Sequence, residues 1–148
     1  MAATIQSDVV IAGGGLAGIV AALEALRAGK SVALVDRDTP ERFGGMALVG
    51  TPLQARMKIP DTPERALADW LRFGELGEDE RWPLAWARYY VEHSRSEVYD
   101  WLIAQGVTFM PAVNWVERGM NGDGNSLPRY HIVWGTSQFL TRTLIAAM

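Results

Sequence analysis

The chain has 148 residues, of which 49% are hydrophobic and 21% are charged, as in an ordinary folded globular protein. Its formal net charge of −3 gives no electrostatic reason to expect a nucleic-acid partner. The lack of cysteine excludes disulfides, thiolate metal sites and cysteine nucleophiles, and we expect no metal site. We expect no signal peptide or membrane span, because no basic residue precedes the first apolar stretch and glycines interrupt it. A cytoplasmic protein is expected.

The first informative feature is a glycine-rich turn between a short apolar run and an alanine-rich stretch. Residues 9–11 are β-branched and predict a strand buried on both faces, and the glycines that follow are spaced G-x-G-x-x-G. In a dinucleotide site the first glycine permits a tight turn and the second lets the backbone approach a pyrophosphate. The third lets helix and strand pack closely, and the helix presents its first N–H groups to the phosphates. The predicted cofactor-binding residues of this turn are Gly13, Gly15, Leu16, Ala17 and Gly18.

An acidic residue after the next predicted strand strengthens this interpretation. A helix over 16–28 and a strand over 31–35 lead to Asp36, about 20 residues past the glycines, where a carboxylate would accept from ribose hydroxyls. Arg37 would favour a 2′-phosphate and hence NADP, but the adjacent carboxylate would repel that group, so we interpret Arg37 as part of the rim. The pattern predicts a dinucleotide site and does not separate FAD from NAD. The alternative, a turn needed only for packing, is disfavoured by the register of Asp36.

Downstream, the sequence predicts helices joined by loops. Residues 37–61 contain three prolines and the glycine pair 44–45, and therefore predict a loop. Residues 62–64 (Thr-Pro-Glu) combine a capping hydroxyl, a proline at the first helical position and an acid in the first turn, which is typical of a helix start. Further expected elements are helices over 62–73 and 83–105, a brief strand over 107–109, a loop over 111–128 and a helix from 136. The six tryptophans, including Trp82, Trp86 and Trp101, are interpreted mainly as core and helix-packing anchors.

These elements predict an α/β fold, a Rossmann-like βαβ unit with appended helices. Two convincing strands and one brief candidate are fewer than a doubly wound sheet requires. We therefore expect an incomplete part of a larger protein fold. The chain would then be a truncated product, or a subunit that needs a complementing chain or forms a homo-oligomer.

Two further segments carry a resemblance to a known family: Phe43-Gly-Gly-Met-Ala-Leu-Val49 and Gly124-Asn-Ser-Leu-Pro-Arg-Tyr-His131. With them, the chain resembles the N-terminal part of the FAD-binding dehydrogenases of the succinate dehydrogenase/fumarate reductase flavoprotein family. The likeness is to the branch that is also similar to 3-ketosteroid dehydrogenases. It implies FAD as the cofactor and hydride transfer to or from a substrate C–C bond. It also implies a small-molecule substrate, either a dicarboxylate or a 3-ketosteroid.

The resemblance implies further site residues. Gly44, Gly45 and Met46 would place backbone N–H groups against the flavin pyrophosphate or ring. Arg129 and His131 would face the flavin and substrate, and they are the candidate catalytic groups. A lone histidine in such aromatic surroundings is, however, more often a hydrogen-bonded structural residue.

Two departures from the family qualify these expectations. Family members are several times longer and carry a substrate-capping domain that is absent from residues 1–148. They also usually have two glycine pairs where this chain has one. We therefore expect a partial FAD-binding domain that is not a competent dehydrogenase alone. The alternatives are an NAD(P)-binding dehydrogenase domain and a non-catalytic remnant or subunit.

Overall fold

The computed structural model describes residues 4–37, 45–77, 79–118 and 124–148, so the predicted contact Gly44 lies outside the described residues. The chain divides into two compact units. The first unit comprises residues 1–44, 105–107 and 133–148, and the second unit comprises residues 45–104 and 108–132. Each unit buries apolar side chains of its own, such as Leu23 in the first and Leu102 in the second.

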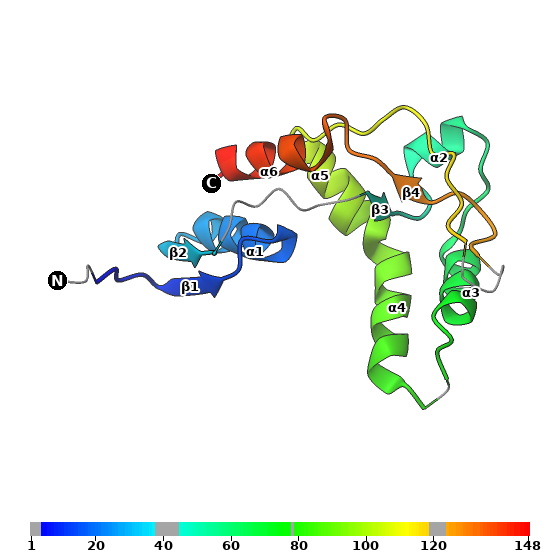
Figure 1. The fold of residues 1–148 in the computed structure, drawn as a ribbon, viewed down its shortest axis with the longest axis horizontal. Coiled ribbons are helices and arrows are strands. Elements are labelled where there is room, and N and C mark those ends of the chain that lie inside the picture. The colour runs from blue at the N-terminus through cyan, green and yellow to red at the C-terminus, as the bar shows by residue number, and fades with distance from the viewer. Residues whose placement is uncertain (1–3, 38–44, 78, 119–123) are drawn as a thin grey trace. The chain divides into compact units, whose positions relative to one another are not determined.

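The first unit is built on the predicted β-α-β segment (Figure 1). Its elements are β1 (Val9–Ala12), α1 (Leu16–Arg27), β2 (Val32–Val35) and α6 (Thr136–Ala146). β1 and β2 are parallel with Val9 opposite Val32, α1 packs against both strands, and α6 contacts α1. The predicted strands and helices of this unit, including the helix that starts at Thr136, are therefore confirmed to within one or two residues.

The burial of β1 differs from the prediction. Val10 is 68% exposed, although this strand was expected to be buried on both faces, and Val35 on β2 is 54% exposed. Ile11 shows why, since its side chain points to α1 near Gly18, and Val10 therefore points to the opposite face of the strand pair. Within the described residues, one face of this pair is covered and the other is exposed.

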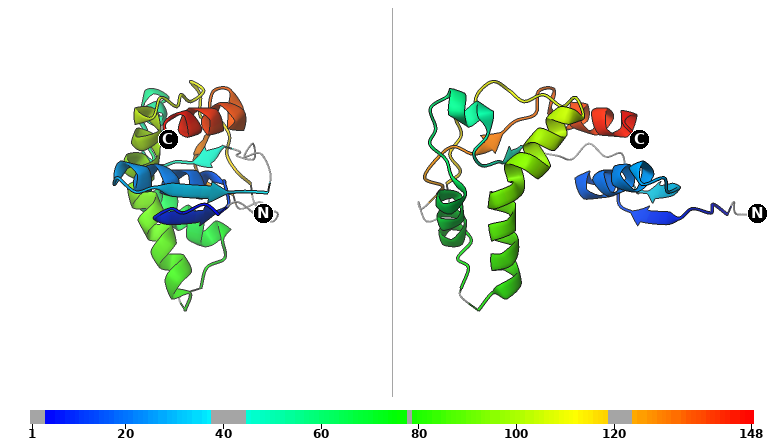
Figure 2. Two further views of the ribbon diagram at one scale, coloured as in Figure 1. Left: turned by 90° about the vertical axis from the view of Figure 1, so that its left-hand side faces the viewer. Right: turned by 180° about the vertical axis from the view of Figure 1, so that it is seen from behind.

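The second unit consists of helices beside a short two-stranded ribbon (Figure 2). Its elements are β3 (Met46–Ala47), α2 (Pro52–Arg56), α3 (Pro63–Phe73), α4 (Arg81–His93), the π-helical segment η1 (Ser94–Asp100), α5 (Trp101–Ala104) and β4 (Tyr130–His131). α3 and α4 pack side by side, and β3 pairs antiparallel with β4, with Met46 opposite His131. The ribbon joins the start of this unit to its end.

Two helix predictions in the second unit are confirmed. α3 begins as expected, because the Thr62 hydroxyl accepts the Arg65 N–H at 3.3 Å and Pro63 occupies the first turn. The long helix expected over 83–105 is present as α4, η1 and α5 in succession. The π-helical turns lie where Ser94 is buried and its hydroxyl accepts the Val49 N–H at 3.2 Å.

Three other predictions were wrong. The expected loop over 37–61 contains β3 and α2, and Thr51 and Gln54 start α2 with a reciprocal capping box. Of the strand expected over 107–109, only an isolated β-bridge at Phe109 is present, and the Met110 N–H donates to the Ile132 carbonyl at 2.8 Å. Trp82 and Trp86 are 67% and 69% exposed, so they lie on the outward face of α4 and not in the core.

The helices also bear on the membrane question. No helix within the described parts of the chain has both the length and the apolar character needed to cross a membrane.

Candidate functional site

The glycine turn of the first unit joins β1 to α1 by a close backbone approach. Gly13 has φ +109°, where a side chain would be strained, and its N–H donates to the Val35 carbonyl at 2.8 Å. Gly18 faces this turn, and a Cβ at position 18 would overlap the Gly13 carbonyl oxygen. Gly18 therefore allows the close packing of helix on strand that the motif predicts.

The N-terminus of α1 has the properties of an anion-binding site. Gly15 is the N-cap residue; among the described residues no side chain caps the helix, and its first turn holds no acid. A Cβ at Gly15 would meet no atom within 4 Å, so a ligand can approach the backbone there. The helix N–H groups and the positive end of the helix dipole are thus available to a phosphate. These residues fit the pyrophosphate of a dinucleotide.

Asp36 lies against the same turn. Its Oδ2 accepts the N–H of the buried Gly14 at 2.5 Å. One open hollow is lined by Ala12, Gly13, Val35, Asp36 and Arg37. The structure therefore brings the predicted carboxylate, the first glycine and the rim arginine together. That these residues bind a cofactor stays a prediction.

The other predicted cofactor contacts, Gly45 and Met46, lie in the second unit. Met46 is part of β3. The Gly45 N–H, which we expected to face a flavin, donates to the Tyr130 hydroxyl oxygen at 2.6 Å. In this structure the predicted donor is therefore already bound by a side chain.

Arg129 is buried between two carboxylates. Its Nε and Nη2 donate to the two oxygens of Asp61, each at 2.8 Å, and its Nη1 donates to Asp69 Oδ2 at 2.6 Å. Burial opposes the charge on Arg129, but the bonds with both carboxylates outweigh burial and raise its pKa above the ordinary value. The guanidinium holds the two acids in place. A catalytic role for Arg129 stays a prediction.

Asp69, on α3, is the acceptor at the centre of this cluster. Its Oδ1 accepts from Arg72 at 2.7 Å, and its Oδ2 accepts from the Ser126 N–H and hydroxyl at 2.8 and 2.7 Å. Burial opposes ionisation of Asp69, but the bonds from Arg129 and Ser126 more than offset it, so its pKa lies below the ordinary value. Through Ser126 and Arg129, the segment 124–131 is therefore hydrogen-bonded to α3. Sequence reasoning missed Asp69, although an acid on the same helix face as the buried Ala66 was a usable signal.

His131 is fully buried, and both of its ring nitrogens are engaged. Nδ1 lies 2.6 Å from the Arg129 carbonyl, which can only accept, so Nδ1 carries the proton. Nε2 then accepts from the Thr51 hydroxyl at 2.8 Å. Burial lowers the pKa of His131, so the ring is neutral. These contacts tie β4 to the start of α2. A catalytic role for His131 stays a prediction.

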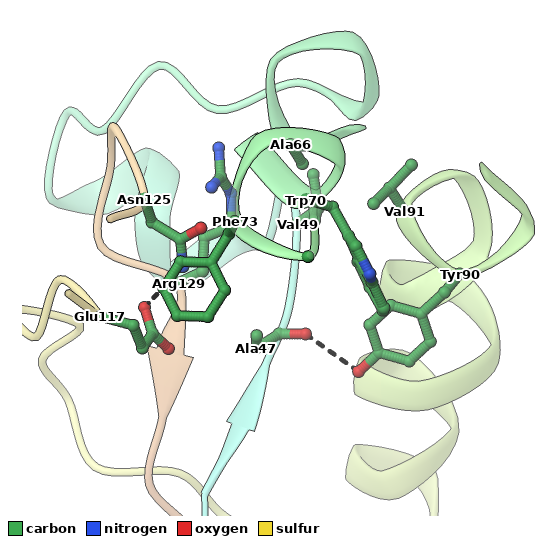
Figure 3. Close-up of a pocket in the computed structure, with 11 residues that line it drawn as sticks. Ala47, Val49, Ala66, Trp70, Phe73, Tyr90, Val91, Glu117, Asn125 and Arg129 are labelled. Carbon is green, nitrogen blue, oxygen red and sulfur yellow. Dashed lines mark hydrogen bonds between the residues drawn. The ribbon is translucent and has the colours of Figure 1, made fainter. Parts of the chain in front are cut away.

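A cavity of about 250 Å³ lies among α3, α4 and β3 in the second unit (Figure 3). Aromatic side chains form much of its wall, with the rings of Trp70 and Tyr90 edge to face at 5.4 Å between centroids and Phe73 nearby. The Tyr90 hydroxyl donates to the Ala47 carbonyl at 2.9 Å, and burial raises the pKa of this phenol, which is therefore neutral. The sequence did not predict this cavity.

Among the described residues, the polar end of the cavity carries an acid and no unpaired cation. Asn125 donates to Glu117 Oε2 at 2.8 Å, and Arg129, which also lines the cavity, is ion-paired with Asp61 and Asp69. The other residues that line the cavity are mostly apolar. The cavity is therefore suited to a neutral apolar molecule more than to an anion.

Comparison with known proteins identifies relatives of this chain. A KsdD-like steroid dehydrogenase from Mycolicibacterium smegmatis is 43% identical over 149 residues, which cover 91% of this chain and 27% of that protein. The open conformation of a flavocytochrome c3 fumarate reductase matches with a TM-score of 0.73 and 25% identity, covering 95% of this chain and 24% of that one. The 3-ketosteroid-Δ4-(5α)-dehydrogenase from Rhodococcus jostii RHA1, solved with 4-androstene-3,17-dione, shares the fold, with a TM-score of 0.72, 24% identity and coverage of 95% and 35%.

The family model for the FAD binding domain matches residues 8–146. The chain spans about a quarter of the length of the M. smegmatis relative and up to about a third of the matched structures. These matches confirm the resemblance and the α/β fold class. With its parallel β1–β2 pair and glycine turn, the chain belongs to the FAD binding domain family of the flavoprotein dehydrogenases.

Proposed function

We propose that this chain binds FAD through its first unit and serves a dehydrogenase that acts on an apolar substrate. The observation that carries the proposal is that Gly13 and Asp36 line one hollow at the turn that leads into α1, whose N-terminus has no side-chain cap among the described residues. Family membership favours FAD over NAD(P). Bound FAD would accept or supply the hydride at a substrate C–C bond.

The residues of the first unit would hold the ADP half of the cofactor. The N–H groups that open α1 would bind the pyrophosphate, and Asp36 would accept from ribose hydroxyls. The Asp36 carboxylate would also repel a 2′-phosphate, which disfavours NADP. Because the chain spans about a quarter of its curated relative, we propose that it supplies cofactor and substrate contacts and not the whole reaction.

The Gly15→Val variant tests the cofactor site without disturbing the fold. Valine should weaken FAD binding by about 100-fold or more, because its side chain would lie where the pyrophosphate approaches the backbone. The folded state should tolerate it, since φ at Gly15 is −68° and a Cβ there meets no atom within 4 Å. The measurements are quenching of FAD fluorescence on titration and the midpoint of thermal unfolding.

Gly77→Ala is the control, because a Cβ at Gly77 also meets no atom within 4 Å and the residue belongs to the second unit. It should bind FAD as the wild type does. Wild-type protein that binds NAD but not FAD would contradict the cofactor assignment.

For the substrate, the cavity of the second unit favours a steroid-like molecule over a dicarboxylate. A dicarboxylate would need unpaired cations, whereas Arg129 is already paired with two acids and Glu117 adds a negative charge. Aromatic and aliphatic walls bind apolar rings. The 43% sequence identity with a KsdD-like steroid dehydrogenase also favours a steroid-like substrate.

We expect Phe73→Ala to weaken binding of 4-androstene-3,17-dione by about 5- to 10-fold, because the ring removes apolar surface of the ligand from water. Phe139→Ala is the control, since Phe139 is similarly exposed (38% against 44%) and lies on α6 in the first unit. Equilibrium dialysis with labelled steroid, with fumarate as competitor, measures both variants. Tighter binding of fumarate than of the steroid would contradict the substrate proposal.

A further inference from the structure

Glu117 lines the polar end of the cavity in the second unit, and half of its carboxylate is unused. One oxygen, Oε2, accepts the side-chain N–H of Asn125 at 2.8 Å, and the Glu117 carbonyl accepts the Asn125 backbone N–H at 2.9 Å. Figure 3 shows the two side chains beside the ring of Phe73. Within the described parts of the chain, no hydrogen bond or ion pair engages the other oxygen, Oε1. The wall of the cavity therefore includes an acceptor that the protein leaves unpaired.

The cation that lines the same cavity does not neutralise this carboxylate. The Nε, Nη1 and Nη2 atoms of Arg129 each donate to Asp61 or Asp69. The aromatic walls carry no charge. A ligand that reaches Glu117 therefore meets a negative oxygen, and an ionised carboxylate can only accept a hydrogen bond.

The amide of Asn125 adds a donor next to this acceptor. Its side-chain nitrogen carries two hydrogens, and Glu117 takes one of them, so one N–H remains to donate. A hydroxyl group matches both residues, because its hydrogen can go to Glu117 Oε1 while its oxygen accepts from Asn125. A ketone can use the Asn125 N–H alone, and its partly negative oxygen would lie beside the carboxylate. The polar end of the cavity therefore favours an alcohol over the corresponding ketone.

We propose that Glu117 and Asn125 are specificity-determining residues that select an apolar ring compound with a hydroxyl group. The inference rests on the proposed function and deepens it, because it takes the same cavity as the substrate site. It narrows the substrate class from a steroid-like molecule to a steroid alcohol. Both residues and the aromatic walls belong to the second unit.

The test compares 4-androstene-3,17-dione with testosterone and dehydroepiandrosterone, two alcohols of similar size that carry the hydroxyl at opposite ends of the ring system. Equilibrium dialysis with the full chain should show that at least one alcohol binds about 5- to 20-fold more tightly than the dione. The reason is that the dione cannot donate to the charged acceptor Glu117. This comparison uses the wild type and does not depend on the folding of a variant.

Glu117→Gln should abolish the preference and let the dione bind at least as tightly as the alcohols. The glutamine amide keeps an oxygen for the bond from Asn125 and places an N–H where Oε1 was. Glu97→Gln is the matched control, because Glu97 accepts from the Tyr89 hydroxyl at an exposed site and does not line the cavity. It should keep the preference for the alcohol. The midpoint of thermal unfolding checks that both variants are folded.

Three results would overturn the inference and leave the steroid proposal standing. They are equal or tighter binding of the dione by the wild type, an alcohol preference that survives in Glu117→Gln, and loss of the preference in a folded Glu97→Gln variant. Failure of all three steroids to bind would contradict the substrate proposal and the inference together. Quenching of FAD fluorescence would then still test the cofactor site of the first unit by itself.

Discussion

Arg129→Met should destabilise the second unit by about 3–5 kcal/mol, because it removes the cation that pairs with the buried Asp61 and leaves the buried Asp69 with Arg72 alone. Both carboxylates are almost fully buried, with side-chain exposures of 0% and 3%. Methionine fills a similar volume but carries no charge and no hydrogen-bond donor. The substitution therefore removes the charge and the hydrogen bonds and leaves the packing volume nearly unchanged. Denaturant unfolding followed by circular dichroism measures the change.

Arg95→Met provides a matched control for the same chemical change. Arg95 lies 3.9 Å from Asp100, and both side chains are more than half exposed. An exposed pair of this kind contributes at most about 0.5 kcal/mol, because water and salt screen it. Equal effects of the two substitutions would show that the buried cluster does not hold the second unit together.

The elements predicted from the sequence were those set by local signals. The glycine turn, the parallel β1–β2 pair and the start of α3 at Thr62 depend on residues close together in the chain. The ribbon could not be predicted, because Met46 and His131 are far apart in sequence and each strand has only two residues. Pairing of such short strands is decided by tertiary contacts and not by propensity.

The contacts of the segment 124–131 in the second unit were also beyond what local sequence signals could predict. The segment 124–131 was noticed as a pattern, but its partners Asp61 and Asp69 lie more than 50 residues away. The helix expected over 83–105 likewise included Trp86 without giving the face that is buried, and Trp82 and Trp86 proved exposed. The capping box at Thr51 and Gln54 is the exception, because it was visible locally and was missed.

Gly18→Ala should lower the free energy of unfolding of the first unit by about 3 kcal/mol, which is a large effect for one methyl group. The methyl carbon would overlap the Gly13 carbonyl oxygen and lie 3.3 Å from the Ile11 side chain, so α1 would have to move away from β1. Helix propensity predicts the opposite sign, since alanine is favoured over glycine within a helix by about 1 kcal/mol. The sign of the change in the free energy of unfolding therefore shows whether the steric overlap or the helix propensity dominates.

Gly15→Ala is the comparison that isolates this contact. It makes the same substitution three residues earlier, where a Cβ meets no atom within 4 Å, and should leave the stability of the first unit nearly unchanged. Hydrogen exchange of the α1 amides reports on this unit directly, and denaturant unfolding gives the free energy. If Gly18→Ala were as stable as the wild type or more stable, helix and strand would not be held at the distance described, and the pyrophosphate site built on that approach would be wrong.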